Sequence, residues 1–156
     1  ATAAAFIAPA SFAEPVGGAV FGIVEPVCEV SDAFADQEFA SLTTGAIVND
    51  TFDVQCNDAD GALLRVKSAN GGLINTDVPT GDPGRRVDYE ARITTGVFSF
   101  AAPGQTDGTE DDQLIRATST GSWSGVDNGL LEIELLGDAI YAGMYQDIIL
   151  IELEAR

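Results

Sequence analysis

The chain has no histidine, and it has a single lysine, a single methionine and a single tryptophan among its 156 residues. Without histidine it lacks the commonest general base and the usual serine and cysteine catalytic triads, and most zinc sites are excluded as well. Catalysis would depend on carboxylates alone, so the sequence predicts that the protein is not an enzyme. No run of about 18 apolar residues is present to span a bilayer, and insertion into a membrane is therefore not expected.

Basic residues are scarce: 7 Lys and Arg stand against 25 Asp and Glu, which gives a net charge of −18 at pH 7. A surface of this sign repels phosphate, and this excludes nucleic acid and anionic lipid as partners. Apolar residues make up 46 % of the chain, which is enough for a hydrophobic core, and the length suits one domain. The composition therefore favours a folded structural or binding protein.

Two acidic loops, residues 57–61 and 106–112, are the nearest features to a cation site. The spacing of an EF-hand would require an oxygen ligand at the position of Cys56, and the distal glutamate is missing, so we interpret both loops as solvated turns. Trp123 lies among small residues, and we interpret it as an aromatic side chain packed on the end of the domain, with a sugar-stacking site as the alternative. The sequence predicts no metal site and no cofactor.

The only cysteines are Cys28 and Cys56, at a spacing far from that of a redox C-x-x-C motif. An even number of cysteines in a chain with signs of export favours one structural disulfide. The alternative is a pair of buried free thiols in a cytosolic protein. A disulfide at this spacing would stabilise the fold by about 3–4 kcal/mol through the loop that it closes.

Apolar and polar side chains alternate in five segments, which indicates strands with one face in the core and one face in water. Clusters of Gly, Pro, Asn and Asp separate these segments and predict turns. A helical apolar stripe is nowhere sustained, and residues 32–42 predict one helical turn at most. Seven or so short strands in a chain of this length predict an all-β antiparallel sandwich. The alternating segments are residues 52–56, 64–67, 87–93, 131–135 and 149–153.

The N-terminal residues 1–13 are apolar and rich in alanine, and Ser11-Phe12-Ala13 satisfies the small-x-small rule for signal peptidase. We interpret this segment as a signal-peptide remnant or as a retained tail that packs on a partner. Both interpretations place the protein outside the cytoplasm. A second apolar segment precedes Cys28 and has no evident place in its own sandwich.

Three features follow one another along the chain: a cysteine pair whose second member ends a strand, an arginine ahead of an apolar–tyrosine strand, and a closing segment with Gly, Tyr and Asp at alternate positions before alternating apolar residues. The residues concerned are Cys28, Cys56, Arg86, Val87, Tyr89, Gly143, Tyr145, Asp147, Ile149, Ile151 and Leu153. In this order they resemble the spore coat protein U domain, a family that includes the pilins of archaic chaperone–usher pili. The resemblance extends over residues 16–154, although residues 97–124 match no pattern of the family.

This resemblance implies an incomplete immunoglobulin-like antiparallel β-sandwich that is completed by a donor strand from a neighbouring subunit. The neighbour would fill a hydrophobic groove by β-augmentation, and head-to-tail repetition would generate a filament. Residues 1–24 would form the N-terminal extension and donor strand, and residues 25–156 the pilin sandwich. The acceptor groove would be lined by Tyr145, Ile149, Ile151 and Leu153, beside another edge strand.

Archaic pilins place the donor segment just before the first cysteine, which here implies residues 16–24. Val16, Val20 and Val24 share one face of this segment with two glycines, while Phe21 and Ile23 lie on the other face. The register is open by one residue, and a slip of one exchanges the two faces. The alternative donor is the apolar stretch of residues 3–13.

The function implied by the resemblance is that of a structural pilin subunit, which polymerises by donor-strand exchange into an extracellular pilus for attachment and biofilm formation. Its partners would be identical subunits, together with a periplasmic chaperone and an outer-membrane usher during assembly. The protein would be secreted and displayed on the cell surface. The alternative is a secreted monomeric β-sandwich module that binds carbohydrate or calcium.

Overall fold

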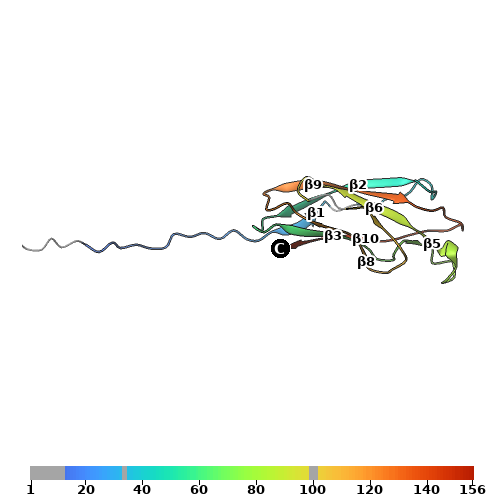
Figure 1. Cartoon of the computed structure of the whole chain (residues 1–156), viewed down its shortest axis with the longest axis horizontal. Helices are drawn as coiled ribbons and strands as arrows, with labels where there is room; N and C mark the ends of the chain where they lie inside the picture. Colours follow the sequence, from blue (N-terminus) through green and yellow to red (C-terminus); the bar gives the residue numbers. More distant parts are fainter. Residues whose placement is uncertain (1–12, 33–34, 99–101) are drawn as a thin grey trace, which may run out of the picture.

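The computed structural model describes residues 13–32, 35–98 and 102–156, and in this part of the chain the domain consists of antiparallel strands with no α-helix. One sheet has the strand order β1-β2-β9-β6-β7 and a second has the order β10-β3-β8. The two sheets form two layers, and a short β4–β5 ladder with one 3₁₀ turn, η1, lies at one end (Figure 1). The bounds are β1 Cys28–Ser31, β2 Ile47–Cys56, β3 Ala62–Ser68, β4 Leu73–Ile74, η1 Pro83–Arg85, β5 Arg86–Val87, β6 Tyr89–Thr94, β7 Gly104–Gln105, β8 Asp112–Thr118, β9 Val126–Leu135 and β10 Ile149–Ala155.

The five segments with alternating polarity all lie in strands, which confirms the all-β antiparallel prediction. Residues 87–93 are divided between β5 and β6 at Asp88. The helical turn expected within residues 32–42 does not form in the described part of that segment. Among the described residues, no helix has the length and apolar character needed to cross a bilayer.

The hydrophobic core lies between the two sheets and is filled by the inward-facing side chains of both. Phe52 of β2 and Tyr89 of β6 come from the larger sheet, Leu64 of β3 comes from the smaller one, and all three are fully buried. Burial of each large apolar side chain contributes about 1.5–3 kcal/mol. The polar residues between them face water, which explains the alternation seen in the sequence.

The two cysteines join the first strand to the end of the second. Cys28 lies directly opposite Cys56 in the β1–β2 ladder, and the two residues form a disulfide. This confirms the predicted disulfide and contradicts the alternative of free thiols. A structural disulfide suits an oxidising compartment.

Replacing both Cys28 and Cys56 with serine is expected to lower the free energy of unfolding by about 3–4 kcal/mol, because the loop between them is no longer closed in the unfolded chain. Urea unfolding of the variant beside the oxidised wild type measures this difference. Intact mass before and after reduction gives the control, since the wild type alone gains the two hydrogens of a reduced disulfide. A variant as stable as the wild type would contradict the prediction.

Candidate functional site

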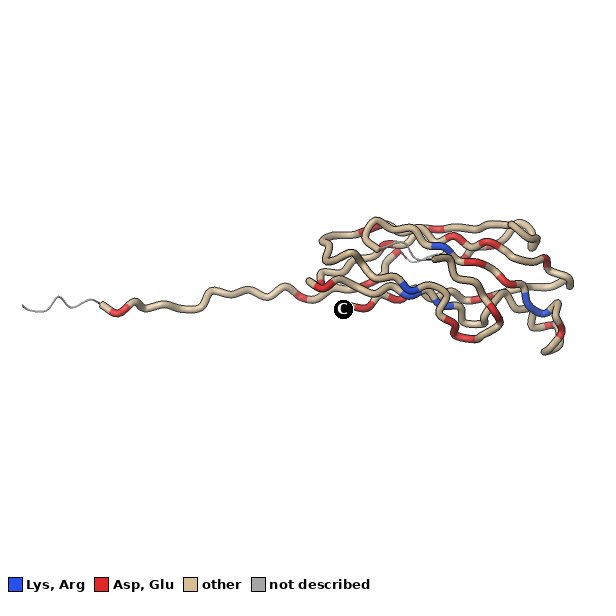
Figure 2. The backbone as a smooth tube through the Cα atoms, viewed as in Figure 1, with Lys and Arg blue, Asp and Glu red and all other residues tan. Residues whose placement is uncertain are grey.

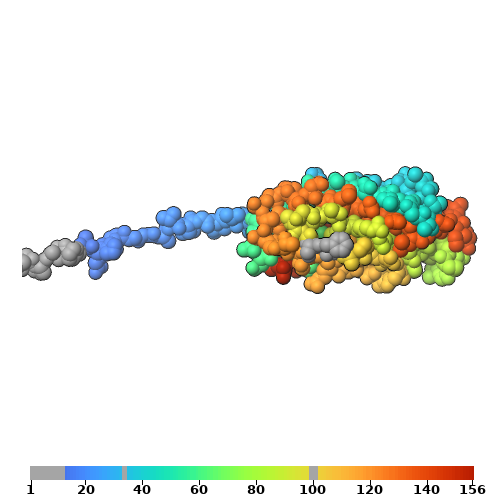
Figure 3. All heavy atoms as spheres, turned by 45° about the horizontal axis from the view of Figure 1, so that its top comes forward, coloured from blue at the N-terminus to red at the C-terminus, as the bar shows by residue number. Residues whose placement is uncertain are grey.

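Residues 13–26 form an extension that stands clear of the domain (Figures 1 and 3). Val16 and Val20 are 99 % and 100 % exposed, and Phe21 is 83 % exposed. Ile23 and Val24 are exposed to a similar degree, so all five residues predicted for the donor strand lie in water. An exposed apolar run of this kind marks a site of interaction rather than a stable surface.

The root of this extension is held by Asn57, which directly follows the disulfide-bonded Cys56. The side-chain oxygen of Asn57 accepts a hydrogen bond from the Val27 N–H at 2.8 Å, and its amide group donates to the Glu25 carbonyl at 2.8 Å. The Asn57 N–H also donates to the Val27 carbonyl at 2.9 Å. These three bonds fix the direction in which the extension leaves the domain.

Strand β10 is the edge strand of the three-stranded sheet, and its outer edge has no strand partner among the described residues. Two backbone hydrogen bonds at the ends of the β3–β10 ladder show which residues of β10 are bonded to β3. The Ala69 N–H donates to the Ile148 carbonyl, and the Arg156 N–H donates to the Gly61 carbonyl. In an antiparallel ladder hydrogen-bonded pairs alternate with pairs that are not bonded, so the even-numbered residues of β10 bond to β3. The backbone groups of the odd-numbered residues therefore face the outer edge.

These odd-numbered residues include Ile149, Ile151 and Leu153, three of the four residues predicted to line the acceptor groove. Their side chains are half-buried and pack against the core. Among the described residues, the outer edge of β10 thus combines N–H and C=O groups that have no strand partner with apolar side chains on the inner face. Such an edge is a template for another strand.

Strand β1 presents a similar edge in the five-stranded sheet. The bond from the Asn57 N–H to Val27 and the β1–β2 register place the backbone groups of Glu29 and Ser31 toward β2. The backbone groups of Cys28 and Val30 consequently face away from β2, while their side chains pack against the core. The Cα atoms of β1 and β10 approach within 8 Å, yet the two strands share no ladder.

Tyr145, the fourth residue predicted for the groove, precedes β10 and is 8 % exposed. Its hydroxyl donates to the Gly84 carbonyl at 2.8 Å and accepts from the Tyr141 N–H at 3.2 Å. The ring therefore anchors the segment that leads into β10, and three of the predicted groove residues lie on the strand while the fourth supports its start.

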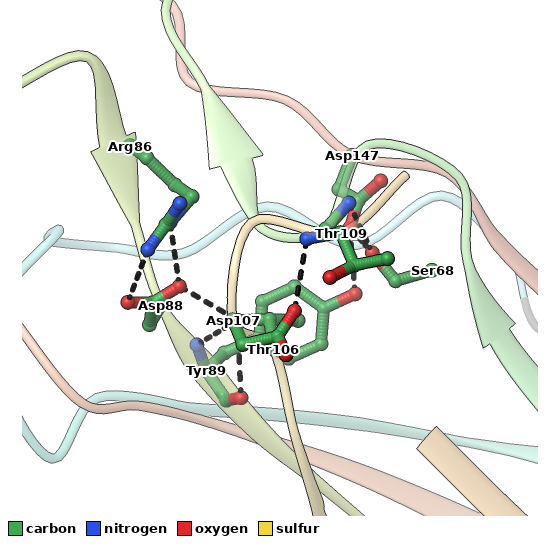
Figure 4. A network of polar contacts seen from close by, with 9 residues as sticks. Ser68, Arg86, Asp88, Tyr89, Thr106, Asp107, Thr109 and Asp147 are labelled. Carbon is green, nitrogen blue, oxygen red and sulfur yellow. Dashed lines mark hydrogen bonds and ion pairs between the residues drawn. The ribbon is translucent and has the colours of Figure 1, made fainter. Parts of the chain in front are cut away.

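Asp147 provides a second anchor just before β10 (Figure 4). Its carboxylate accepts hydrogen bonds from the hydroxyls of Ser68 and Tyr89 and from the Asn70 N–H. Ser68 and Tyr89 are fully buried. Burial raises the pKa of the Tyr89 phenol and the carboxylate beside it raises that pKa further, so Tyr89 stays protonated and donates at all ordinary pH values.

The acidic loops have local roles in the structure. Asp58 accepts from the Asp60 N–H within loop 57–61, and Asp107 accepts from the Thr109 N–H within loop 106–112. The bonds from Thr109 lower the pKa of Asp107. In the described part of the chain, no three Asp, Glu or Cys side chains are grouped to hold a metal ion. Trp123 is half-buried and packs edge-on against Phe98, with ring centroids 5.6 Å apart.

Two parts of this site are not predicted from the sequence. For residues 57–61 the sequence predicts only an acidic turn, and the bonds from Asn57 to the root of the extension were not expected. A side-chain amide directly after a strand-ending cysteine is the one sequence feature that could have indicated them. The identity of the other edge strand, β1, depends on the order of strands in the sheet. Alternating polarity does not predict that order. No family model matches the chain, and a comparison with curated proteins finds no significant match.

Proposed function

We propose that this protein is a structural subunit that polymerises by donor-strand exchange into an extracellular, pilus-like fibre. The observation that carries the proposal is a strand-length apolar segment, free in solvent, on a domain whose β10 edge is unpaired within the described residues. A segment of one copy that pairs with the edge of the next would bury both features. Because such a contact is head-to-tail and does not close, it generates a filament.

The lengths of the two partners support the proposal. Strand β10 has seven residues, and residues 16–24 are long enough to pair with all of them. Backbone bonds would form with Ile149, Ile151 and Leu153, and one face of the donor would cover their side chains. Neighbouring strands in a sheet lie about 4.8 Å apart, so a donor strand inserted between β1 and β10 needs about twice that distance between them. Because Cα atoms of β1 and β10 now approach within 8 Å, the two strands would have to move apart when the donor enters.

In this proposal each domain is an incomplete immunoglobulin-like sandwich, completed by the donor strand of its neighbour. An unpaired apolar edge is prone to aggregation until it is covered. A periplasmic chaperone would cover it before assembly, and an outer-membrane usher would order the subunits at the cell surface. Attachment and biofilm formation are the roles proposed for the fibre.

Electron microscopy and size-exclusion chromatography of the natively expressed full-length protein test the proposal. Thin unbranched fibres that survive dilution are expected, because each joint combines backbone pairing with several buried anchors. Treatment with hot detergent should release a 16.2 kDa subunit from them. A stable 16.2 kDa monomer that forms no fibres would reject the proposal and favour the secreted binding module.

A further inference from the structure

The extension leaves the domain at the end where β10 finishes. The Arg156 N–H bonds to Gly61 in the loop that contains the Asn57 clamp, and Figure 1 shows the C-terminus beside the root of the extension. The extension points away from the domain along its long axis. In a head-to-tail array it therefore enters the next copy at the opposite end, where β10 begins, and runs antiparallel to β10.

A cleft of about 840 Å³ lies at that opposite end. Met144 and Gln146, which precede β10, line it together with Arg85 of η1 and Arg86 of β5. Met144 is 73 % exposed although it is apolar. The cleft therefore adjoins the point at which an incoming extension would reach β10.

The cleft is lined by two of the seven cationic side chains of this acidic chain, together with the acidic residues Asp82, Asp88 and Glu110. Arg86 is paired with Asp88 at 2.8 Å, and the Asp82 carboxylate accepts from the Gly84 N–H and the Tyr141 hydroxyl. Arg85 is half-buried and donates to the Val78 carbonyl, but within the described residues it has no carboxylate within 4 Å. Its charge is thus available to a group from outside the domain.

The root of the extension supplies a matching carboxylate. Glu25 is exposed, and Asn57 binds its backbone carbonyl and leaves its side chain in water. When residues 16–24 pair with β10, Glu25 comes level with the residues just before Ile149, among them Gln146 of the cleft. Acidic segments lie near the root of the extension (Figure 2), and the acidic loop 57–61 beside it would bring further negative charge to the same end of the neighbour.

We infer that the cleft is a docking site for the root of the neighbouring subunit, in which Arg85 pairs with Glu25 of a second copy. This inference rests on the proposed function and adds a second contact to each joint. The two contacts together fix the angle between successive domains.

A charge exchange in the full-length chain tests the inference. Fibres of the wild type, Glu25→Arg, Arg85→Glu and the double variant are dissociated in urea at low salt, where charge pairs are not screened, and the released subunit is followed over time. Each single variant is expected to dissociate about fivefold faster, because it places like charges together, and the double variant to return within about twofold of the wild type. Arg116→Glu is the matched control, since it makes the same charge change at an exposed residue of β8 that does not line the cleft.

Glu25 lies in the exposed extension, so Glu25→Arg tests the pair even if Arg85→Glu impairs folding. Single variants that dissociate like Arg116→Glu, or a double variant with no recovery, would overturn the inference while fibres still form and the proposed function stands. A wild type without fibres would overturn both.

Discussion

We expect Val20→Asp to abolish fibre formation while the domain folds as before. Val20 is 100 % exposed in the subunit, so the substitution removes no contact within the domain. In a joint it would remove an anchor worth about 1.5–3 kcal/mol and would bring an uncompensated carboxylate against an apolar edge. Fibre yield by electron microscopy and the Cys28–Cys56 disulfide by intact mass are the two measurements.

Val126→Asp is the matched control, because Val126 is also apolar and 60 % exposed but lies at the start of β9. The same substitution at Phe21 determines the register, since neighbouring residues of a strand face opposite sides. If Val20 faces the groove, Phe21→Asp assembles better than Val20→Asp, and the order reverses if Phe21 faces the groove. Normal assembly of both variants would contradict the donor assignment.

Asp147→Ala is expected to lower the free energy of unfolding by roughly 2–5 kcal/mol, because it leaves the buried hydroxyls of Ser68 and Tyr89 without their acceptor. Asp147→Asn keeps one acceptor oxygen and should cost less. The measurement is urea unfolding of the monomeric domain.

The exposed Asp36 provides the control, since Asp36→Ala changes the same charge and should stay within about 0.5 kcal/mol of the wild type. We expect Asp36→Ala to be the most stable of the three variants, Asp147→Asn to be intermediate and Asp147→Ala to be the least stable. Equal stability of Asp147→Ala and Asp36→Ala would mean that the network beside β10 does not support the fold.

Much of the fold was predictable because a half-buried strand repeats its polarity every two residues. Alternation does not predict strand β8, and the reason is physical: Leu114 and Ile115 are adjacent and both buried. The pairing of β8 with β3 shifts register between Val66 and Lys67, and such an irregularity interrupts the alternation of faces. A pattern with period two cannot reveal a strand that does not keep that period.

The candidate site was predictable only in part. Alternation predicted that Ile149, Ile151 and Leu153 lie on a strand, while their place in an acceptor groove came from the family resemblance and stays a prediction. The disulfide was predictable because the chain has only two cysteines. The open edges of β1 and β10 depend on the order of strands in each sheet, which local polarity does not determine. Whether Arg85 has an acidic partner depends on which carboxylates lie close to it in the fold. With 25 acidic residues in the chain, the sequence does not predict which of them these are.

The position of the disulfide also sets the mechanical behaviour of the molecule. Tension on the extension enters the domain at Cys28, and the covalent link passes it at once to Cys56 at the end of β2. The chain between the two cysteines is bypassed, so β1 cannot be peeled away and unravelled ahead of its neighbour. The load is instead carried as shear between β2 and β9, which form the longest ladder in the described part of the domain. Under shear along the strands, the backbone hydrogen bonds of this ladder must break together rather than one after another.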